Sequence, residues 1–279
     1  MENETSPLKK YRRQPKIYIN LPSRGKYYNT NVVNNDSFTE LPVFSMTAND
    51  EILFKTPDAL INGQATAQNI KSCIPSILDP MNLVTLDIDH ILLGIRMATY
   101  GPSLSVTSKC KHCEHENKYD IDIQKILDYF NTLEYEDTIS IENFVVKLKP
   151  LTYRQYTEMQ QRNTALTRAL RVQSSRIKDD KEKAEFQNRT LQQIATIAVE
   201  FIFSSIYSIT VDGVEETNKS EIKEFLDDND ITFYNQIKKH IETQVDQWNI
   251  PNQRVQCEEC EKENTVIVRV DQSDFFVKG

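Results

Sequence analysis

The chain has 279 residues, with 33 Lys and Arg against 41 Asp and Glu, and its formal net charge is −8. This length predicts about two domains, and the 39% hydrophobic and 27% charged residues are typical of a globular protein. The six glycines are too few and too widely spaced for a Walker loop or a dinucleotide-binding fingerprint. The composition therefore excludes the common nucleotide-binding motifs, and the acidic balance makes nucleic acid an improbable partner.

Membrane and export signals are not found in the sequence. No apolar run approaches the roughly 18 residues that span a bilayer, so we expect no membrane span. The first residues lack the apolar core of a signal peptide. We therefore expect a protein made in a reducing cytosol, where its five cysteines are thiols or metal ligands rather than disulfides.

Residues 1–16 carry five cations and two carboxylates. This composition predicts a disordered basic arm. The simplest interpretation is a solvated tail. The alternative is an arm that docks on an acidic partner surface, and the candidate partner-binding residues are Lys9, Lys10, Arg12 and Arg13, with Arg24 in the turn that follows.

Residues 17–102 have the pattern of an N-terminal α+β domain. Thr47 and Asp50 have the spacing of a capping box, which predicts the start of a helix. Pro75 marks a kink or an end in the next helix, and Gly101 lies where a helix stop belongs. The pattern predicts strands over 17–21 and 41–46, and helices over 47–54, 64–78 and 87–99.

The middle of the chain differs from this first part, because residues 152–207 contain neither Gly nor Pro. We expect two long helices there, paired as a hairpin, and we expect the second to lie inside because it is rich in Leu and Ile. The predicted elements are helices over 152–178 and 180–207, a short β-hairpin around Asp212 and Gly213, and helices over 220–226 and 231–248. Together they predict an inserted helical domain over residues 124–252.

Four cysteines form two C-x-x-C pairs, Cys110 with Cys113 and Cys257 with Cys260, separated by 143 residues. An internal repeat relates the pairs, because the segment from Cys110 aligns with the segment from Cys257 in both cysteines, two glutamates and one asparagine. Strand-like residues flank each pair. Two such knuckles facing each other offer four sulfurs to one ion, the arrangement of a closed structural Zn²⁺ site.

Other interpretations of these residues are open. Two separate redox pairs would require an activated cysteine at a helix N-terminus. A catalytic zinc could use His240 and Glu242 with the second cysteine pair, as in the H-x-E…P-C-x-x-C signature of zinc deaminases. Gln256, however, stands where that signature has a proline. His112 or His115 could replace a cysteine ligand, but both are expected to face solvent. The fifth cysteine, Cys73, is expected to be a small buried residue.

A shared ion would make the fold α+β and predominantly helical, with a zinc-ribbon-like pair of β-hairpin knuckles and a large helical insertion. Residues 103–123 and 253–277 would be the two halves of the ribbon. The metal would then act as a clamp, because closing a loop on the order of 100 residues is worth about 4–5 kcal/mol.

Several segments carry a resemblance to one family. They are Leu21-Pro22-Ser23-Arg24-Gly25 with Tyr27-Tyr28, Met46 to Glu51, Leu60 to Gly63, Asp89 to Leu93, and Arg96 to Gly101. In this order they resemble the baseplate hub assembly proteins of T-even-like contractile-tailed bacteriophages, best over residues 17–125. The resemblance implies a non-enzymatic protein, either a hub component or a hub assembly factor.

The resemblance also implies other baseplate, hub or tail proteins as partners, with no small-molecule substrate. It implies a location in the virion tail baseplate, or in the host cytoplasm during phage assembly. The 152–207 hairpin, which carries Arg162, Arg168, Arg171 and Arg176 on its first helix, could offer a docking face. The alternative function is a zinc-ribbon nucleic-acid-binding regulator, which the basic arm favours and the acidic second knuckle opposes.

Overall fold

The computed structural model describes residues 8, 11–34, 38, 40–54, 63–270 and 275–276. Lys9 and Lys10 of the predicted arm lie outside the described residues. The fold is mixed α/β, with small antiparallel sheets and two separate hydrophobic cores.

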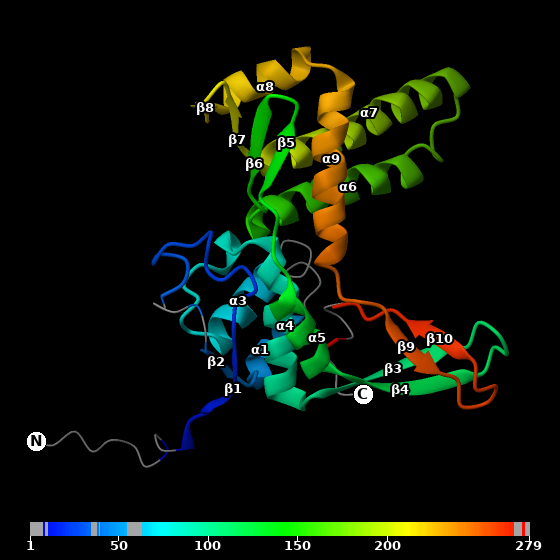
Figure 1. Cartoon of the computed structure of the whole chain (residues 1–279). Coiled ribbons are helices and arrows are strands. Elements are labelled where there is room, and N and C mark those ends of the chain that lie inside the picture. Colours follow the sequence, from blue (N-terminus) through cyan, green and yellow to red (C-terminus); the bar gives the residue numbers. More distant parts are fainter. Residues whose placement is uncertain are drawn as a thin grey trace, which may run out of the picture.

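The first core surrounds helix α4 (Thr85–Tyr100), in which eleven of sixteen residues are buried. The antiparallel strands β1 (Pro15–Ile19) and β2 (Leu41–Phe44) and the helix α3 (Gln64–Cys73) pack against α4 (Figure 1). Helix α1 (Ala48–Phe54) and the short 3-10 helix η2 (Pro80–Asn82) pack against α3. The strands and helices predicted here are confirmed, with shifted ends. Pro15 and Lys16, assigned to the arm from the sequence, belong to β1.

Local chemistry explains where these helices begin and end. The Thr47 hydroxyl accepts a hydrogen bond from the Asp50 N–H at 3.3 Å, and the Asp50 carboxylate accepts one from the Thr47 N–H at 2.7 Å, as the capping box predicted. Helix α3 ends at Cys73 because Pro75 disfavours helical geometry in the residue before it. Helix α4 ends at Gly101, whose φ is 94°.

Two β-hairpins project from the first core. Strand β3 (Ser103–Lys109) pairs with β4 (Glu116–Asp122), and β9 (Gln253–Gln256) pairs with β10 (Glu263–Val266). Helix α5 (Ile123–Thr132) follows β4 directly and buries its apolar face in the first core. Along the chain, residues packed against the first core continue to Tyr135, and those of the second core begin at Ile139.

The second core lies under a four-stranded antiparallel sheet in the order β5-β6-β7-β8. Helices α8 (Lys219–Asp228) and α9 (Ile231–Gln247) contribute to this core. The predicted β-hairpin around Asp212 and Gly213 is confirmed as β7 and β8, and the sheet also contains two strands, β5 and β6, that the sequence did not predict. The strands are β5 (Thr138–Ile141), β6 (Phe144–Leu148), β7 (Ile206–Val211) and β8 (Val214–Glu216).

Helices α6 (Tyr153–Val172) and α7 (Asp180–Ser205) form an antiparallel hairpin that projects from the second core (Figure 1). The prediction of a hairpin is confirmed, but α7 lies inside only in part. Leu191 is 51% exposed and Val199 is 49% exposed. Of the apolar stripe that the sequence predicts for α7, Ile197 and Ile202 are buried, Ile194 and Phe201 are half-buried, and Leu191 and Ala198 are exposed. In the described part of the chain, no helix has the length and hydropathy needed to cross a membrane.

Candidate metal centre

The two C-x-x-C knuckles have the same backbone geometry. In the first, the Cys110 N–H donates to the His115 carbonyl at 2.9 Å, and the Glu114 N–H donates back to the Cys110 carbonyl at 3.0 Å. Glu114 has a φ of 59°, which lets the chain turn sharply between the strands. The second knuckle repeats both hydrogen bonds at 3.0 Å, from Cys257 to Lys262 and from Glu261 to Cys257, with a φ of 57° at Glu261. The sequence repeat is therefore also a structural repeat.

The four sulfurs of the knuckles converge. The Sγ atoms of Cys110 and Cys260 lie 3.7 Å apart, and those of Cys113 and Cys257 lie 3.6 Å apart. All four lie within 4.8 Å of one another. A tetrahedral site with Zn–S bonds of about 2.3 Å requires sulfurs about 3.8 Å apart, so the arrangement has the size of such a site.

Two buried asparagines join the knuckles from opposite sides. The Asn117 amide oxygen accepts a hydrogen bond from the Glu258 N–H of the other knuckle at 3.0 Å. The Asn117 amide nitrogen donates to the His115 carbonyl at 3.0 Å and approaches the Cys257 sulfur at 3.5 Å. Its repeat equivalent, Asn264, donates to the Lys109 carbonyl of the first knuckle at 3.4 Å. Each knuckle thus holds the other through the asparagine that the sequence repeat had matched.

Backbone N–H groups are directed at the first sulfur of each knuckle. The His112 N–H lies 3.4 Å from the Cys110 sulfur and is the main cause of the lowered pKa of that thiol. In the second knuckle, the N–H of Cys260 and then that of Glu259 lower the pKa of Cys257 to about 6. These donors stabilise the thiolate form, which is the form that binds a metal.

The histidines considered as alternative ligands lie elsewhere. His112 and His115 are exposed, as expected. The His240 Nε2 atom contacts the Glu136 backbone carbonyl at 2.8 Å, and His240 is not among the residues that converge with the cysteines. Possible metal ligands converge in groups of three or more at one place among the residues that the structure describes, and that group is the four cysteines. The site has the donor set of a closed thiolate centre rather than of an open catalytic one.

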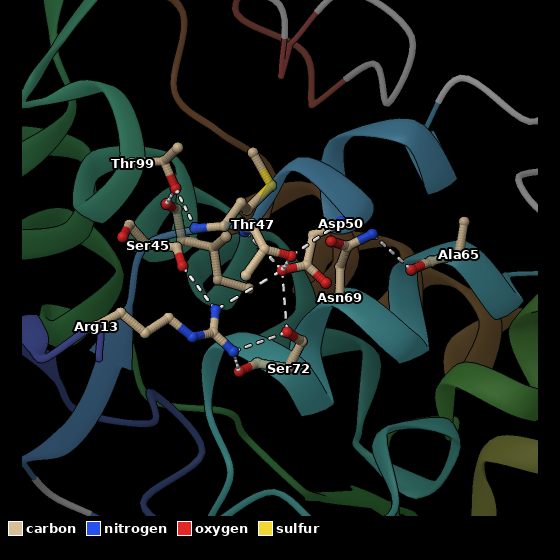
Figure 2. A network of polar contacts seen from close by, with 10 residues as sticks. Arg13, Ser45, Thr47, Asp50, Ala65, Asn69, Ser72 and Thr99 are labelled. Carbon is tan, nitrogen blue, oxygen red and sulfur yellow. Dashed lines mark hydrogen bonds and ion pairs between the residues drawn. The ribbon is translucent and has the colours of Figure 1, made fainter. Parts of the chain in front are cut away.

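Arg13, a candidate partner-binding residue, is engaged within the chain (Figure 2). Its guanidinium donates to the Ser45 carbonyl at 2.7 Å and to the Ser72 carbonyl at 2.6 Å, and it lies 3.7 Å from the Asp50 carboxylate. The end of the predicted arm is thereby fastened across α1 and α3. The neighbouring Arg12 is exposed.

Arg24 and the residues after it contact the segment that links the two cores. Arg24 lies 4.0 Å from Glu134, and both side chains are exposed. Lys26 forms an ion pair of 2.6 Å with Asp137. Between these pairs, Tyr27 packs edge-on against Tyr135 with ring centroids 6.4 Å apart. This part of the chain therefore fastens the linker to the first core.

A buried carboxylate explains the Leu21 to Tyr28 motif. Asp87 is fully buried and accepts hydrogen bonds from the Ser23 N–H at 2.8 Å, the Ser23 hydroxyl at 2.5 Å and the Tyr28 hydroxyl at 2.6 Å. Desolvation raises the pKa of Asp87, and the three donors oppose this rise. This cluster was not predicted from the sequence, although an aspartate inside an apolar helical stripe is a signal of a buried carboxylate that needs hydrogen-bond donors.

A family model described as "T4 bacteriophage base plate protein" matches residues 15–277. Comparisons with curated proteins and with solved structures return no match. The family match spans both cores, both cysteine knuckles and the projecting hairpin. The chain belongs to the T4 bacteriophage base plate protein family.

Proposed function

We propose that this protein is a component of the baseplate hub, or a factor that assembles the hub, and that it acts through protein–protein contacts rather than catalysis. The family match over residues 15–277 carries the proposal, since it assigns a structural role in the virion tail baseplate. The order of the segments from Leu21 to Gly101 supports the finer assignment to the hub. The partners proposed are other hub, baseplate or tail proteins.

We further propose that Cys110, Cys113, Cys257 and Cys260 bind one structural Zn²⁺ and form a zinc-ribbon-like pair of knuckles. The convergence of four sulfurs at tetrahedral spacing supports this proposal, as do the N–H groups directed at two of them. The ion would supply no reactivity, because four thiolates leave no open coordination position. Its role would be to join residues 103–123 to residues 253–270.

The alternative of a nucleic-acid-binding regulator has little support from the surface. The second knuckle exposes Glu258, Glu259, Glu261 and Glu263, which would repel phosphate. A gel shift of DNA or RNA at low salt that weakened steeply with added salt would nevertheless establish that function.

Affinity capture of the tagged protein from infected cells tests the functional proposal. Recovery of hub or baseplate subunits, together with density for this chain in cryo-EM maps of tails or assembly intermediates, is the expected result. Capture without any tail protein would contradict the proposal.

Elemental analysis of the purified protein tests the metal, with one zinc per chain expected. A cobalt-substituted protein should show the absorption of a four-thiolate site. A metal-free preparation that folds normally would exclude the proposed structural zinc.

A further inference from the structure

A half-buried carboxylate without a partner lies where elements of the two cores meet. Asp89 of α4 is half-buried, and desolvation raises the pKa of its carboxyl to about 6. Within the part of the chain that the structure describes, no hydrogen bond or ion pair reaches this carboxylate. Asp87, two positions earlier, shows how the chain satisfies a buried carboxylate, since three donors bond to it. Charges withdrawn from water are normally paired in proteins, so the unpaired Asp89 requires an explanation.

A polar cavity of about 520 Å³ opens beside Asp89. It lies between α4, α5, the end of α9 and the segment that follows β10. The residues that line it carry two carboxylates, two amides and an aromatic ring; they are Asp89, Asp246, Asn249, Asn252 and Tyr129. Carboxylate and amide oxygens accept hydrogen bonds, and an aromatic face attracts a positive charge. These groups together suit an organic cation.

An apolar cavity of about 180 Å³ adjoins the polar one, because Asp89 and Asn249 line both. The large apolar residues around this second cavity come from α4, α7 and the end of α9; they are Leu86, Ile88, Phe201, Val245 and Trp248. Asp89 therefore lies at the boundary between a polar space and an apolar one.

The chain's own cation at the polar cavity does not supply the missing partner. Arg269 lines this cavity, but it is exposed, and within the described residues it has no carboxylate within 4.0 Å. The two carboxylates of Asp89 and Asp246 exceed this one cation, so the lining keeps a negative charge. The cavity is therefore complementary in charge to an incoming cation.

The boundary position of Asp89 narrows the class of cation. A divalent metal ion takes several oxygen ligands, and among the described residues no group of three possible metal ligands converges at this cavity. A lysine or arginine side chain fits both spaces, because it joins a cationic head to a chain of methylene groups. Its head would pair with Asp89 while its methylene groups cover apolar residues of the second cavity.

We propose that this cavity binds a lysine or arginine side chain of a partner protein, with the ammonium or guanidinium group on the Asp89 carboxylate. The proposal rests on the proposed function, because the partner expected is a hub, baseplate or tail subunit. In the free chain the unpaired carboxylate costs stability, and the partner's cation would remove that cost upon binding. The site lies outside the cysteine cluster and does not depend on the zinc.

Binding of capped amino acids to the purified full-length chain tests the site. The probes are N-acetyl-arginine methylamide, its lysine counterpart, and its citrulline counterpart, which has the shape of arginine without the charge. Trp248 is the only tryptophan, so its indole N–H gives a single NMR signal from the lining of the apolar cavity. A charged probe should shift this signal at concentrations at least about tenfold lower than the citrulline probe, because only the charged probe forms a charge-assisted hydrogen bond. Equal effects of charged and neutral probes, or no shift with any of them, would overturn the proposal.

The Asp89→Asn variant removes the charge and keeps the shape of the side chain. It should bind the arginine probe at least about tenfold more weakly than the natural chain. Because the same change removes the desolvation penalty, the variant should also unfold at a higher urea concentration near neutral pH, so weaker binding cannot come from a loss of folding. The matched control Asp128→Asn removes an exposed carboxylate of α5, next to Tyr129 but outside the lining. This control should bind like the natural chain, and an equal loss in both variants would refute a specific pairing with Asp89.

Capture from infected cells tests the source of the cation and separates this proposal from the proposed function. The natural chain and the Asp128→Asn control should recover the same tail subunits. The Asp89→Asn variant should recover at least one of these subunits in an amount reduced at least about tenfold, because one partner of a charge pair is missing. Unchanged recovery by Asp89→Asn would overturn the proposal and leave the baseplate role untouched. Failure of the natural chain to recover any tail subunit would instead contradict the proposed function, on which the identity of the partner depends.

Discussion

Removal of the proposed Zn²⁺ should destabilise the folded chain by an amount that depends on the separation of the cysteine pairs along the chain. To build the same four-thiolate site, the unfolded chain has to close a loop with Cys113 and Cys257, which are 144 positions apart. Closing a loop of this length costs about 5 kcal/mol. The folded chain has already closed it, so the metal binds the folded form more tightly by about this free energy and stabilises it accordingly.

Urea unfolding followed by tryptophan fluorescence measures this difference. Trp248 is the only tryptophan and is buried in the first core, which also contains the apolar residues of both knuckle hairpins. With an m-value of about 3 kcal/mol/M, the loss of about 5 kcal/mol should lower the unfolding midpoint by roughly 2 M urea. The midpoint should fall both after removal of zinc with a chelator and in the Cys113→Ser variant.

Two controls distinguish the clamp from other effects of chelator or thiol loss. The Cys113→Ser variant should no longer respond to the chelator. The Cys73→Ala variant, which alters a buried cysteine outside the cluster, should respond as fully as the natural chain. An unchanged midpoint after zinc removal, verified by elemental analysis, would refute the reasoning that one ion holds both knuckles.

Three further predictions use the same unfolding assay. Asn117→Ala should cost about 2–3 kcal/mol, because it removes both the acceptor for the Glu258 N–H and the donor to the first knuckle. Ser23→Ala should cost about 1.5–3 kcal/mol by removing one hydroxyl donor from the buried Asp87 carboxylate. Desolvation raises the pKa of Asp89 to about 6, so its charged form destabilises the fold above that pH and the penalty disappears as the pH falls through 6 toward 4. Asp89→Asn should therefore stabilise the chain on the order of 2 kcal/mol at pH 7.5 and by almost nothing near pH 4.

The cysteine cluster could be predicted from sequence because the repeat encodes it twice. A tight turn needs a fixed spacing of its cysteines, and the strands on either side need alternating apolar residues, so both signals are local. Asn117 and Asn264 were matched by the same repeat, but their role was not visible. Each asparagine bonds to the opposite knuckle, and only the three-dimensional arrangement shows which backbone groups it reaches.

The β5–β6 hairpin and the exposure of α7 could not be predicted in the same way. The turn of that hairpin has Glu142 at a φ of 52° and contains no glycine, so the usual sequence signal of a tight turn is missing. For α7, the spacing of apolar residues shows which side chains share a face. It does not show how far another layer of the same chain covers that face, and here Ile197 and Ile202 are buried while Leu191 stays exposed.

The base of the hairpin is fastened to the first core independently of the cysteines. Thr152, directly before α6, forms an antiparallel bridge with Val84, and the Tyr153 N–H donates to the Leu83 carbonyl at 2.7 Å. Neither contact involves a knuckle. Under conditions in which the metal-free chain stays folded, the hairpin should therefore keep its position against the first core. Hydrogen exchange at the Tyr153 amide measures this, and faster exchange there upon zinc removal, with the hairpin still helical, would show that the knuckles also position the hairpin.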